Sequence, residues 1–210
     1  MPRSPRSRRE VLSKCMAAGF LISAPLLNEA RVLALWEAAE SLKPTPPNDL
    51  GPFYKRGAPR IDKLSRPGDA GLPLVVSGAV FDSRGNALPG ANLEIWQADP
   101  SGQYDNAGFH YRGQVAAADA GSYTFETKMP GHYPKRVCQH IHYKVSAEGH
   151  KTLVTQLYFA TDPVLEGDPD RNYRKDPILH SRELIRPVTI FADPQSVHAA
   201  VRFEIVLEPA

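Results

Sequence analysis

The chain has 210 residues, which is enough for one domain and a short additional segment. Hydrophobic residues (42%) and charged residues (23%) are close to globular averages, which argues against intrinsic disorder and against a membrane-embedded body. Residues 1–30 carry five basic and two acidic side chains, so the net charge of +2 comes from this segment and the rest is nearly neutral. Broad nucleic-acid binding needs a basic face, and we therefore expect none.

The N-terminal segment has the pattern of an export signal. Arg8 and Arg9 are adjacent and precede an apolar stretch at 16–27, as in a twin-arginine signal. This stretch fits the hydrophobic region of a signal and is too short to span a bilayer, so we expect no stable membrane anchor. We predict a signal peptide over residues 1–34 and a periplasmic or secreted protein. The alternative is a disordered basic tail on a cytoplasmic protein.

A helix and an extended arm are expected next, over residues 35–73. Apolar residues recur at spacings of three and four, which places them on one helical face: Val32, Leu35, Trp36, Ala39 and Leu42. That face would also suit a homodimer contact. A proline-rich linker at 43–48 and a Gly/Pro-punctuated arm at 50–54 follow the helix.

The pattern changes at residue 74 to short apolar runs separated by turn signals. The turn signals lie at 83–86, 99–102, 119–121 and 148–149. Near the C-terminus, apolar residues at 201, 203, 205 and 207 alternate with charged ones, which indicates a half-buried strand. We predict a mainly β fold, an antiparallel β-sandwich over residues 74–210 with one helix before it.

His140 and His142 are the densest candidate site residues. Both lie in an apolar run that reads as a strand, where side chains two residues apart share a face. If residues 147–151 form a turn, the following strand places Gln156 opposite His142 and Tyr158 opposite His140. An imidazole pair on one face suits a metal ion, although many such pairs are only polar residues of a strand.

Two tyrosines stand out by their positions. Tyr104 directly follows the turn at 100–103, and Tyr133 lies in a Pro-Gly-His-Tyr-Pro segment seven residues before His140. Position alone leaves both open as rim aromatics. Cys138 shares parity with the two histidines, so a zinc site of the Cys-x-His-x-His type has to be considered, but it leaves the tyrosines unexplained.

Several ordered segments together resemble the intradiol ring-cleavage dioxygenases, the non-haem ferric enzymes that open catechols. The similarity covers about half of the chain, in the segments LGPFY (50–54), VSGAVFD (76–82), LPGA (88–91), EIWQAD (94–99), GQY (102–104), YRG (111–113), PGHYP (130–134), QHIH (139–142) and TQLYF (155–159). Several motifs in one order are far more specific than any single one.

The resemblance implies an Fe(III) cofactor and a catecholic substrate that O2 cleaves to a muconate-type diacid. The iron ligands implied are Tyr104, Tyr133, His140 and His142. Gln156 matches a glutamine that lines the family's pocket, and Tyr54 lies in the arm expected to close it. By the same resemblance, Tyr133 leaves the metal when substrate binds and accepts a substrate proton.

One position departs from the family pattern. The family usually has an arginine three residues before the first ligand histidine, and Val137 occupies that position. Arg136 is one residue earlier and would share a face with His140 and His142 in a regular strand. We therefore include Arg136 as a candidate catalytic residue, with Arg112 as the alternative.

The expected ligand set suits ferric iron. Phenolate is a hard anionic donor, and tyrosine normally loses its proton near pH 10, so a strongly charged cation is needed to hold two phenolates at neutral pH. Two alternatives remain. The same β pattern fits a non-catalytic transthyretin-like binding module, and a ferrous dioxygenase or hydrolase could combine the histidines with an acid such as Glu148.

Overall fold

The structure is a computed structural model that describes residues 41–133, 136–193 and 196–210. The predicted signal peptide lies outside these residues, as does the predicted helix except for Ser41 and Leu42, which are not helical. The described residues belong to one compact unit. Among them, no helix combines the length and hydropathy needed to cross a bilayer.

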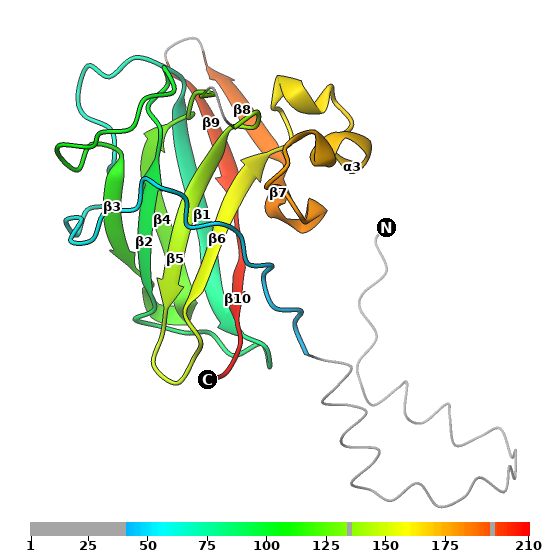
Figure 1. Ribbon diagram of the computed structural model, residues 1–210. Helices are drawn as coiled ribbons and strands as arrows, with labels where there is room; N and C mark the ends of the chain where they lie inside the picture. The colour runs from blue at the N-terminus through cyan, green and yellow to red at the C-terminus, as the bar shows by residue number, and fades with distance from the viewer. Residues whose placement is uncertain (1–40, 134–135, 194–195) are drawn as a thin grey trace, which may run out of the picture. The chain divides into compact units, whose positions relative to one another are not determined.

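The described residues form ten strands in two five-stranded sheets, which confirms the predicted β-sandwich (Figure 1). In the first sheet the order is β10-β1-β9-β8, and β4 pairs with β1; in the second it is β3-β2-β5-β6-β7. The bounds are β1 Pro73–Asp82, β2 Asn92–Gln97, β3 Arg112–Ala116, β4 Ser122–Lys128, β5 His140–Ser146, β6 Leu153–Phe159, β7 Ile185–Arg186, β8 Val188–Asp193, β9 Ser196–Arg202 and β10 Ile205–Leu207.

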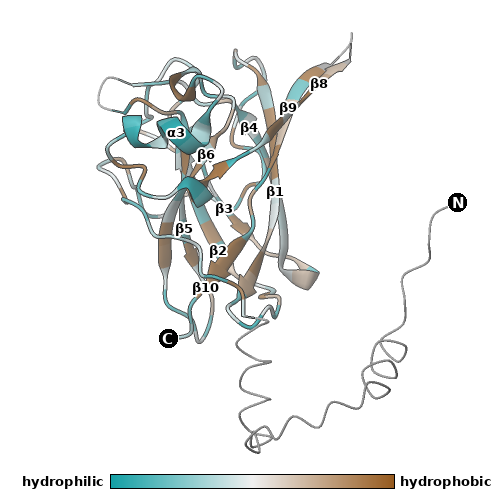
Figure 2. Ribbon diagram, turned by 90° about the vertical axis from the view of Figure 1, so that its right-hand side faces the viewer, coloured by the Kyte–Doolittle hydropathy of each residue, from teal (hydrophilic) through white to brown (hydrophobic). Residues whose placement is uncertain are grey.

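Short helical turns occupy the connections. One 3-10 turn, η1 Asp119–Gly121, precedes β4. The others lie in the excursion at 160–184 between β6 and β7: η2 Pro163–Leu165, α3 Pro169–Asn172, η3 Tyr173–Lys175 and η4 Arg182–Leu184. Figure 2 shows that α3 is hydrophilic, as expected for a surface element, whereas parts of the β8–β9 hairpin are hydrophobic.

Alternation along β2 and β5 separates the core from the outer face of the second sheet. Leu93 and Ile95 of β2, and Ile141 and Tyr143 of β5, belong to the hydrophobic core between the sheets. The residues between them, including His142, therefore lie on the opposite face. The core packs one face of this sheet and leaves the other for polar chemistry.

The β5–β6 hairpin has the predicted register. His142 pairs with Gln156 and His140 pairs with Tyr158, as the turn at 147–151 requires. Three pairings are parallel, which hairpin reasoning does not predict: β1 with β9, β1 with β10, and β6 with β7. Each joins strands that a longer connection separates, so no turn signal records the pairing.

The predicted C-terminal strand is interrupted where it passes Gly78. β9 ends at Arg202 and β10 begins at Ile205, although burial still alternates from 201 to 205. The Phe203 carbonyl approaches Gly78 so closely that an added Cβ would lie 1.9 Å from its oxygen. The absence of a side chain at Gly78 therefore permits the crossing.

The arm at 41–56 covers the edge and the outer face of the second sheet (Figure 1). Thr45 donates its backbone N–H to Val206 O at 3.1 Å in β10. Asn48 then donates its N–H to Val154 O at 2.8 Å in β6. Proline and glycine keep this arm extended, and its path brings residues 49–54 over the face that carries the two histidines.

Candidate metal centre

The structure brings the four predicted ligands into one cluster. His140 and His142 lie at the start of β5, Tyr104 in the loop after β2, and Tyr133 in the loop before β5. The two imidazole centroids are 4.8 Å apart, and the two phenol centroids are 5.6 Å apart. The Tyr104 hydroxyl lies 3.4 Å from Nε2 of His140, and the Tyr133 ring lies 5.9 Å from the His140 ring.

The His140 ring is fixed by a main-chain hydrogen bond. Its Nδ1 lies 2.8 Å from the Cys138 carbonyl oxygen, which can only accept, so Nδ1 carries the proton. Nε2 is therefore the lone-pair nitrogen, and it faces the Tyr104 hydroxyl. Burial, assisted by the nearby Arg136 guanidinium, lowers the pKa of His140 to about 3. The ring is thus the neutral form that binds metal ions.

The His142 ring is held by packing. It stacks on the Trp96 indole with centroids 4.8 Å apart and planes 6° apart. Both ring nitrogens are buried and have no hydrogen-bond partner within the described part of the chain. Burial, together with His140, holds its pKa well below the ordinary value. A buried polar group without a partner is unfavourable, so a neutral imidazole here fits a metal ligand.

The two tyrosine loops are held against each other through glycines. Gly131 donates its N–H to Asp99 O at 2.9 Å. Gly102 has φ +84°, and an added Cβ would lie 2.0 Å from the His132 carbonyl oxygen. Each glycine precedes a tyrosine by two residues, so the close backbone approach sets the separation of Tyr104 and Tyr133.

The environment favours phenolates only if a cation is present. Burial raises the pKa of Tyr104, and the neighbouring Tyr133 raises it further. Burial also raises the pKa of Tyr133, although Arg136 opposes this. Without a cation both phenols therefore stay protonated at neutral pH. A trivalent ion would reverse this, so the donor set of two phenols and two neutral imidazoles fits ferric iron.

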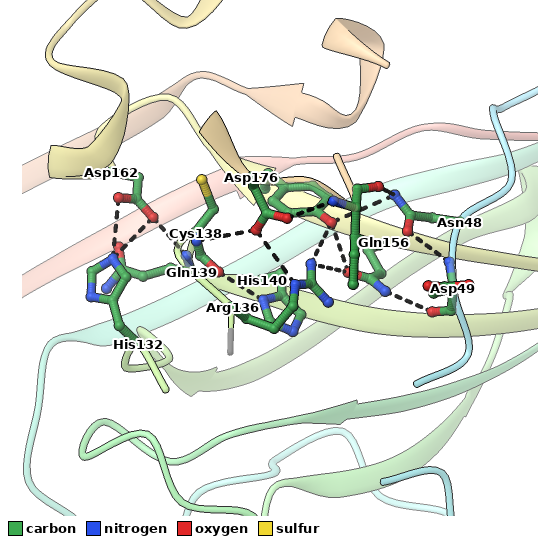
Figure 3. A network of polar contacts seen from close by, with 12 residues as sticks. Asn48, Asp49, His132, Arg136, Cys138, Gln139, His140, Gln156, Asp162 and Asp176 are labelled. Carbon is green, nitrogen blue, oxygen red and sulfur yellow. Dashed lines mark hydrogen bonds and ion pairs between the residues drawn. The ribbon is translucent and has the colours of Figure 1, made fainter. Parts of the chain in front are cut away.

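Arg136 and Gln156 belong to one buried polar network beside the cluster (Figure 3). A terminal guanidinium nitrogen of Arg136 donates to Gln156 Oε1 at 2.9 Å and to the Tyr158 hydroxyl at 2.6 Å. Gln156 donates its Nε2 to the Asp49 carbonyl at 2.6 Å. The network thus ties the arm to β6 and places the guanidinium next to His140.

Arg112 takes a structural position. Its donors reach two main-chain carbonyls, those of Phe53 and of Asp105, the latter at 3.2 Å. It joins the arm to the loop that carries Tyr104, and Phe53 stacks on the Tyr104 ring at 4.1 Å. Arg136, rather than Arg112, is therefore the arginine whose guanidinium meets the polar groups around the histidines.

Tyr54 lies on the same face but its hydroxyl is engaged elsewhere. It donates to Glu94 Oε2 at 2.8 Å and accepts from Lys144 Nζ at 3.2 Å. Its ring packs edge-on against Trp96 at 5.1 Å. Tyr54 therefore contacts the cluster through the indole that supports His142.

The zinc and ferrous alternatives find no support in the geometry. Cys138 lies in the hydrophobic core, and its sulfur points away from His140 (Figure 3). Cys138 was expected to share a strand face with the histidines, but it precedes β5, which begins at His140. Glu148 is exposed in the turn at the opposite end of β5. The described residues contain no group of three His, Cys, Asp or Glu side chains placed to hold a metal ion.

Comparison with known proteins gives the family. The model of the dioxygenase family matches residues 50–209. The chain belongs to the intradiol ring-cleavage dioxygenases. The hydroxyquinol 1,2-dioxygenase of Nocardioides simplex is 32% identical over 187 residues, which are 77% of this chain and 64% of that protein.

Two further relatives of this intradiol dioxygenase chain are also dioxygenases. The catechol 1,2-dioxygenase of Acinetobacter baylyi is 31% identical over 192 residues, covering 78% of this chain and 62% of that protein. A solved dioxygenase domain, from a dioxygenase carbohydrate-binding protein fusion of Streptomyces sp. SirexAA-E, has a TM-score of 0.69 and 34% identity; the match covers 80% of this chain and 100% of that one. The chain spans under two thirds of the length of both curated relatives.

Sequence reasoning about this intradiol dioxygenase chain missed the residues that support the candidate ligands. Trp96 is directly opposite His142 in the β2–β5 pairing, and Phe53 stacks on Tyr104. Asp162 and Asp176 hold the segment before His140. The contacts of Trp96 and Phe53 depend on pairings between distant parts of the chain, which local patterns do not reveal. The sequence could have pointed to these two residues only through their position inside the segments that resemble the family.

Proposed function

We propose that the chain is a ferric dioxygenase that uses O2 to cleave a catechol-type diol between its two hydroxyl-bearing carbons, giving a muconate-type diacid. The observation that carries the proposal is the convergence of two phenols and two imidazoles, one imidazole having both nitrogens buried and without a partner. The relatives named catechol and hydroxyquinol 1,2-dioxygenases support the reaction class.

Tyr104, Tyr133, His140 and His142 would hold Fe(III). When bound, ferric iron supplies Lewis acidity that stabilises the phenolates and draws electron density from a chelating diol, so that its ring reacts with oxygen. The neutral imidazoles supply two donors without adding charge. Two phenolates would offset two of the three positive charges of ferric iron, which lowers the cost of holding the ion in a partly buried site.

Tyr133 would accept a proton from the substrate at its phenolate oxygen. Its ring meets that of Phe53 only edge-on, with centroids 5.8 Å apart. Tyr104, by contrast, is stacked on Phe53. We therefore assign the proton-accepting role to Tyr133 and a fixed ligand role to Tyr104.

Arg136 would stabilise negative charge that develops on the substrate, and Gln156 would hold Arg136 in place. Both polar ends of Gln156 already have partners, since Oε1 accepts from Arg136 and Nε2 donates to the Asp49 carbonyl. Gln156 would thus act chiefly by holding Arg136 and the arm in place. Tyr54 would support the pocket from the arm.

A substrate panel with labelled oxygen tests the proposal. Purified, iron-loaded chain is supplied with catechol, hydroxyquinol or protocatechuate under 18O2, and the products are analysed by mass spectrometry. We expect a ring-opened diacid that carries both oxygen atoms, and about one ferric iron per chain with a visible tyrosinate absorption band. A semialdehyde product would contradict intradiol cleavage. A colourless, inactive chain would instead favour the transthyretin-like binding module.

The Tyr133→Phe variant tests the proton-accepting role. We expect it to retain iron through the three remaining ligands and to lower kcat about 100-fold, because general-base catalysis typically contributes that much. Iron content and steady-state turnover are the measurements. Tyr173→Phe is the matched control, since this tyrosine lies in the excursion and its hydroxyl accepts a hydrogen bond from Arg174. Unchanged turnover in Tyr133→Phe would remove Tyr133 from the mechanism.

We also propose that residues 1–34 direct export by the twin-arginine route. The paired arginines and the short apolar stretch are the supporting features. Replacing Arg8 and Arg9 with lysine should retain the protein in the cytoplasm, which cell fractionation would detect. Unchanged localisation of this double variant would contradict the proposal.

A further inference from the structure

Two buried carboxylates lie outside the candidate ligand set. Asp162 and Asp176 are 2% and 1% exposed, and both belong to the excursion at 160–184 between β6 and β7. Taking a carboxylate out of water is unfavourable unless hydrogen bonds or an opposite charge compensate it. The partners of these two side chains therefore show what they stabilise.

Asp162 binds both ends of the segment at 132–139. Its two oxygens each lie 3.2 Å from Nε2 of His132, and Oδ2 accepts the Gln139 N–H at 2.6 Å. Its Oδ1 also accepts the Val164 N–H at 2.9 Å, which caps η2. The carboxylate thus joins the excursion to residues on either side of Tyr133 and Arg136.

Asp176 binds the same segment further along. Its Oδ2 accepts from Nε of Arg136 at 3.4 Å and from the Cys138 N–H at 3.2 Å. Its Oδ1 accepts the Ile178 N–H at 2.9 Å, within the excursion. Figure 3 shows each carboxylate bonded to a different part of this segment.

The segment at 132–139 needs such support. Its described residues form no helix or strand beyond the bridge between Tyr133 and Arg136. It nevertheless carries the phenol and the guanidinium of the candidate site, and it leads directly into His140. A segment without ladder hydrogen bonds moves unless other groups fix it.

We propose that Asp162 and Asp176 form a carboxylate clamp, defined by these two residues, that positions Tyr133 and Arg136 for the reaction. The inference rests on the proposed function and adds two positioning residues to it. Neither carboxylate is a candidate ligand, so the clamp acts through the segment. Loss of one carboxylate would let the Tyr133 phenol drift from its place, whereas Tyr104 and His142, which lie outside this segment, would keep theirs.

A double-mutant cycle tests the clamp. Asp162→Asn and Asp176→Asn are each made in the iron-loaded wild type and in the Tyr133→Phe background. We expect each to retain iron, shift the tyrosinate absorption band and lower kcat about tenfold, the lower end for losing a supporting group. In the Tyr133→Phe background Asp162→Asn should have no further effect on the band or on kcat. An equal, additive loss in both backgrounds would overturn the positioning role of Asp162.

Asp170→Asn is the matched control. Asp170 lies in the same excursion and its exposed carboxylate pairs with Arg182, so this variant should retain wild-type turnover. If Asp162→Asn behaves like Asp170→Asn, the clamp is wrong. Should Asp162→Asn fail to fold, His132→Ala removes the same attachment from a side chain that is 41% exposed, and it should give the same band shift.

Hydrogen exchange separates failure of the clamp from failure of the proposed function. In the metal-free chain, both clamp variants should exchange the Cys138 and Gln139 amides faster than wild type, while the β1–β4 amides stay protected. Unchanged exchange would overturn the clamp, whatever the enzyme does. A wild type without iron or turnover would instead overturn the proposed function, and the exchange result would still decide the clamp.

Discussion

His140 and His142 are two residues apart on one strand, yet different kinds of interaction hold their rings. His140 is fixed by a hydrogen bond to the Cys138 main chain, and the segment that supplies this carbonyl is tied down by the two buried carboxylates. His142 has no such bond within the described residues and is fixed by the face of Trp96. One imidazole therefore depends on a loop, and the other depends on packing.

The difference shows how one site can tolerate different substitutions on its two sides. The carbonyl oxygen of Cys138 still accepts the hydrogen bond from His140 after any side-chain change at Cys138 that preserves the local backbone. The stacking of Trp96 on His142 is lost when the indole is replaced by a side chain without a ring, because the interaction depends on the contact area and orientation of the indole. We therefore expect remote substitutions to affect His142 through β2 and the arm, and His140 through the excursion.

The largest effect should follow removal of either imidazole. His140→Ala and His142→Ala should each lower iron affinity at least about 100-fold, because the loss of a ligand exceeds the roughly 10–100-fold effect of losing a supporting group. Metal content after dialysis against a chelator measures this. His180→Ala, at an exposed position, should keep its iron. Full iron content in either variant would show that the replaced histidine is not an iron ligand.

A smaller effect is expected for the stacking partner. Trp96→Leu should lower iron affinity about tenfold, as typical for a group behind a ligand, and lower the free energy of unfolding of the metal-free chain by about 3 kcal/mol. Chelator competition and denaturant unfolding measure the two quantities. Trp96→Phe keeps a ring against His142 and should recover most of the affinity. Lost stability with unchanged affinity in Trp96→Leu would show that the indole does not orient His142.

Another effect concerns the stability of the metal-free chain in acid. Burial lowers the pKa of His140 to about 3 and holds that of His142 well below its ordinary value. Below about pH 6.5 the unfolded chain protonates both rings while the folded, metal-free chain keeps them neutral, so the unfolded state binds more protons. The free energy of unfolding of the metal-free chain should therefore fall as the pH falls toward 3. Denaturant titrations at a series of pH values measure it.

The matched comparison for acid is the His140→Gln/His142→Gln double variant without metal. It lacks both buried imidazoles, so its stability should decline less steeply between about pH 6.5 and 4.5. Equal slopes in the two proteins would mean that other groups, such as carboxylates, determine the acid response. In that case, protonation of His140 and His142 would not explain the loss of stability in acid.

Local patterns predicted the parts of the molecule that depend on short separations. Alternation and turn signals gave the β-sandwich, and the turn at 147–151 fixed the pairing of His142 with Gln156. The parallel pairings of β1 with β9 and β10 were not predicted, because nothing near either strand encodes a partner more than a hundred residues away.

The position of Arg136 near the histidines was predicted correctly, but the reason given for it was wrong. Parity along a regular strand suggested that Arg136 reaches the histidine face. In the structure β5 begins only at His140, and Arg136 reaches Gln156 from the preceding loop, with Asp176 on its other side. The two carboxylates of the excursion were not predicted, since no spacing rule links them to the segment they bind.

The arm that crosses the outer face has a consequence for how the chain is made. The Thr45 hydroxyl and the main-chain carbonyls of Pro46 and Asp49 form hydrogen bonds with partners 107 to 161 positions further along, in β6 and β10. During synthesis the arm leaves the ribosome early but finds its partner in β10 only when the last strand has emerged. Contacts of such long range form slowly. A chain truncated before β10 would carry every candidate ligand and the attachments of the arm to β6, but it would lack the two hydrogen bonds between Thr45 and Val206.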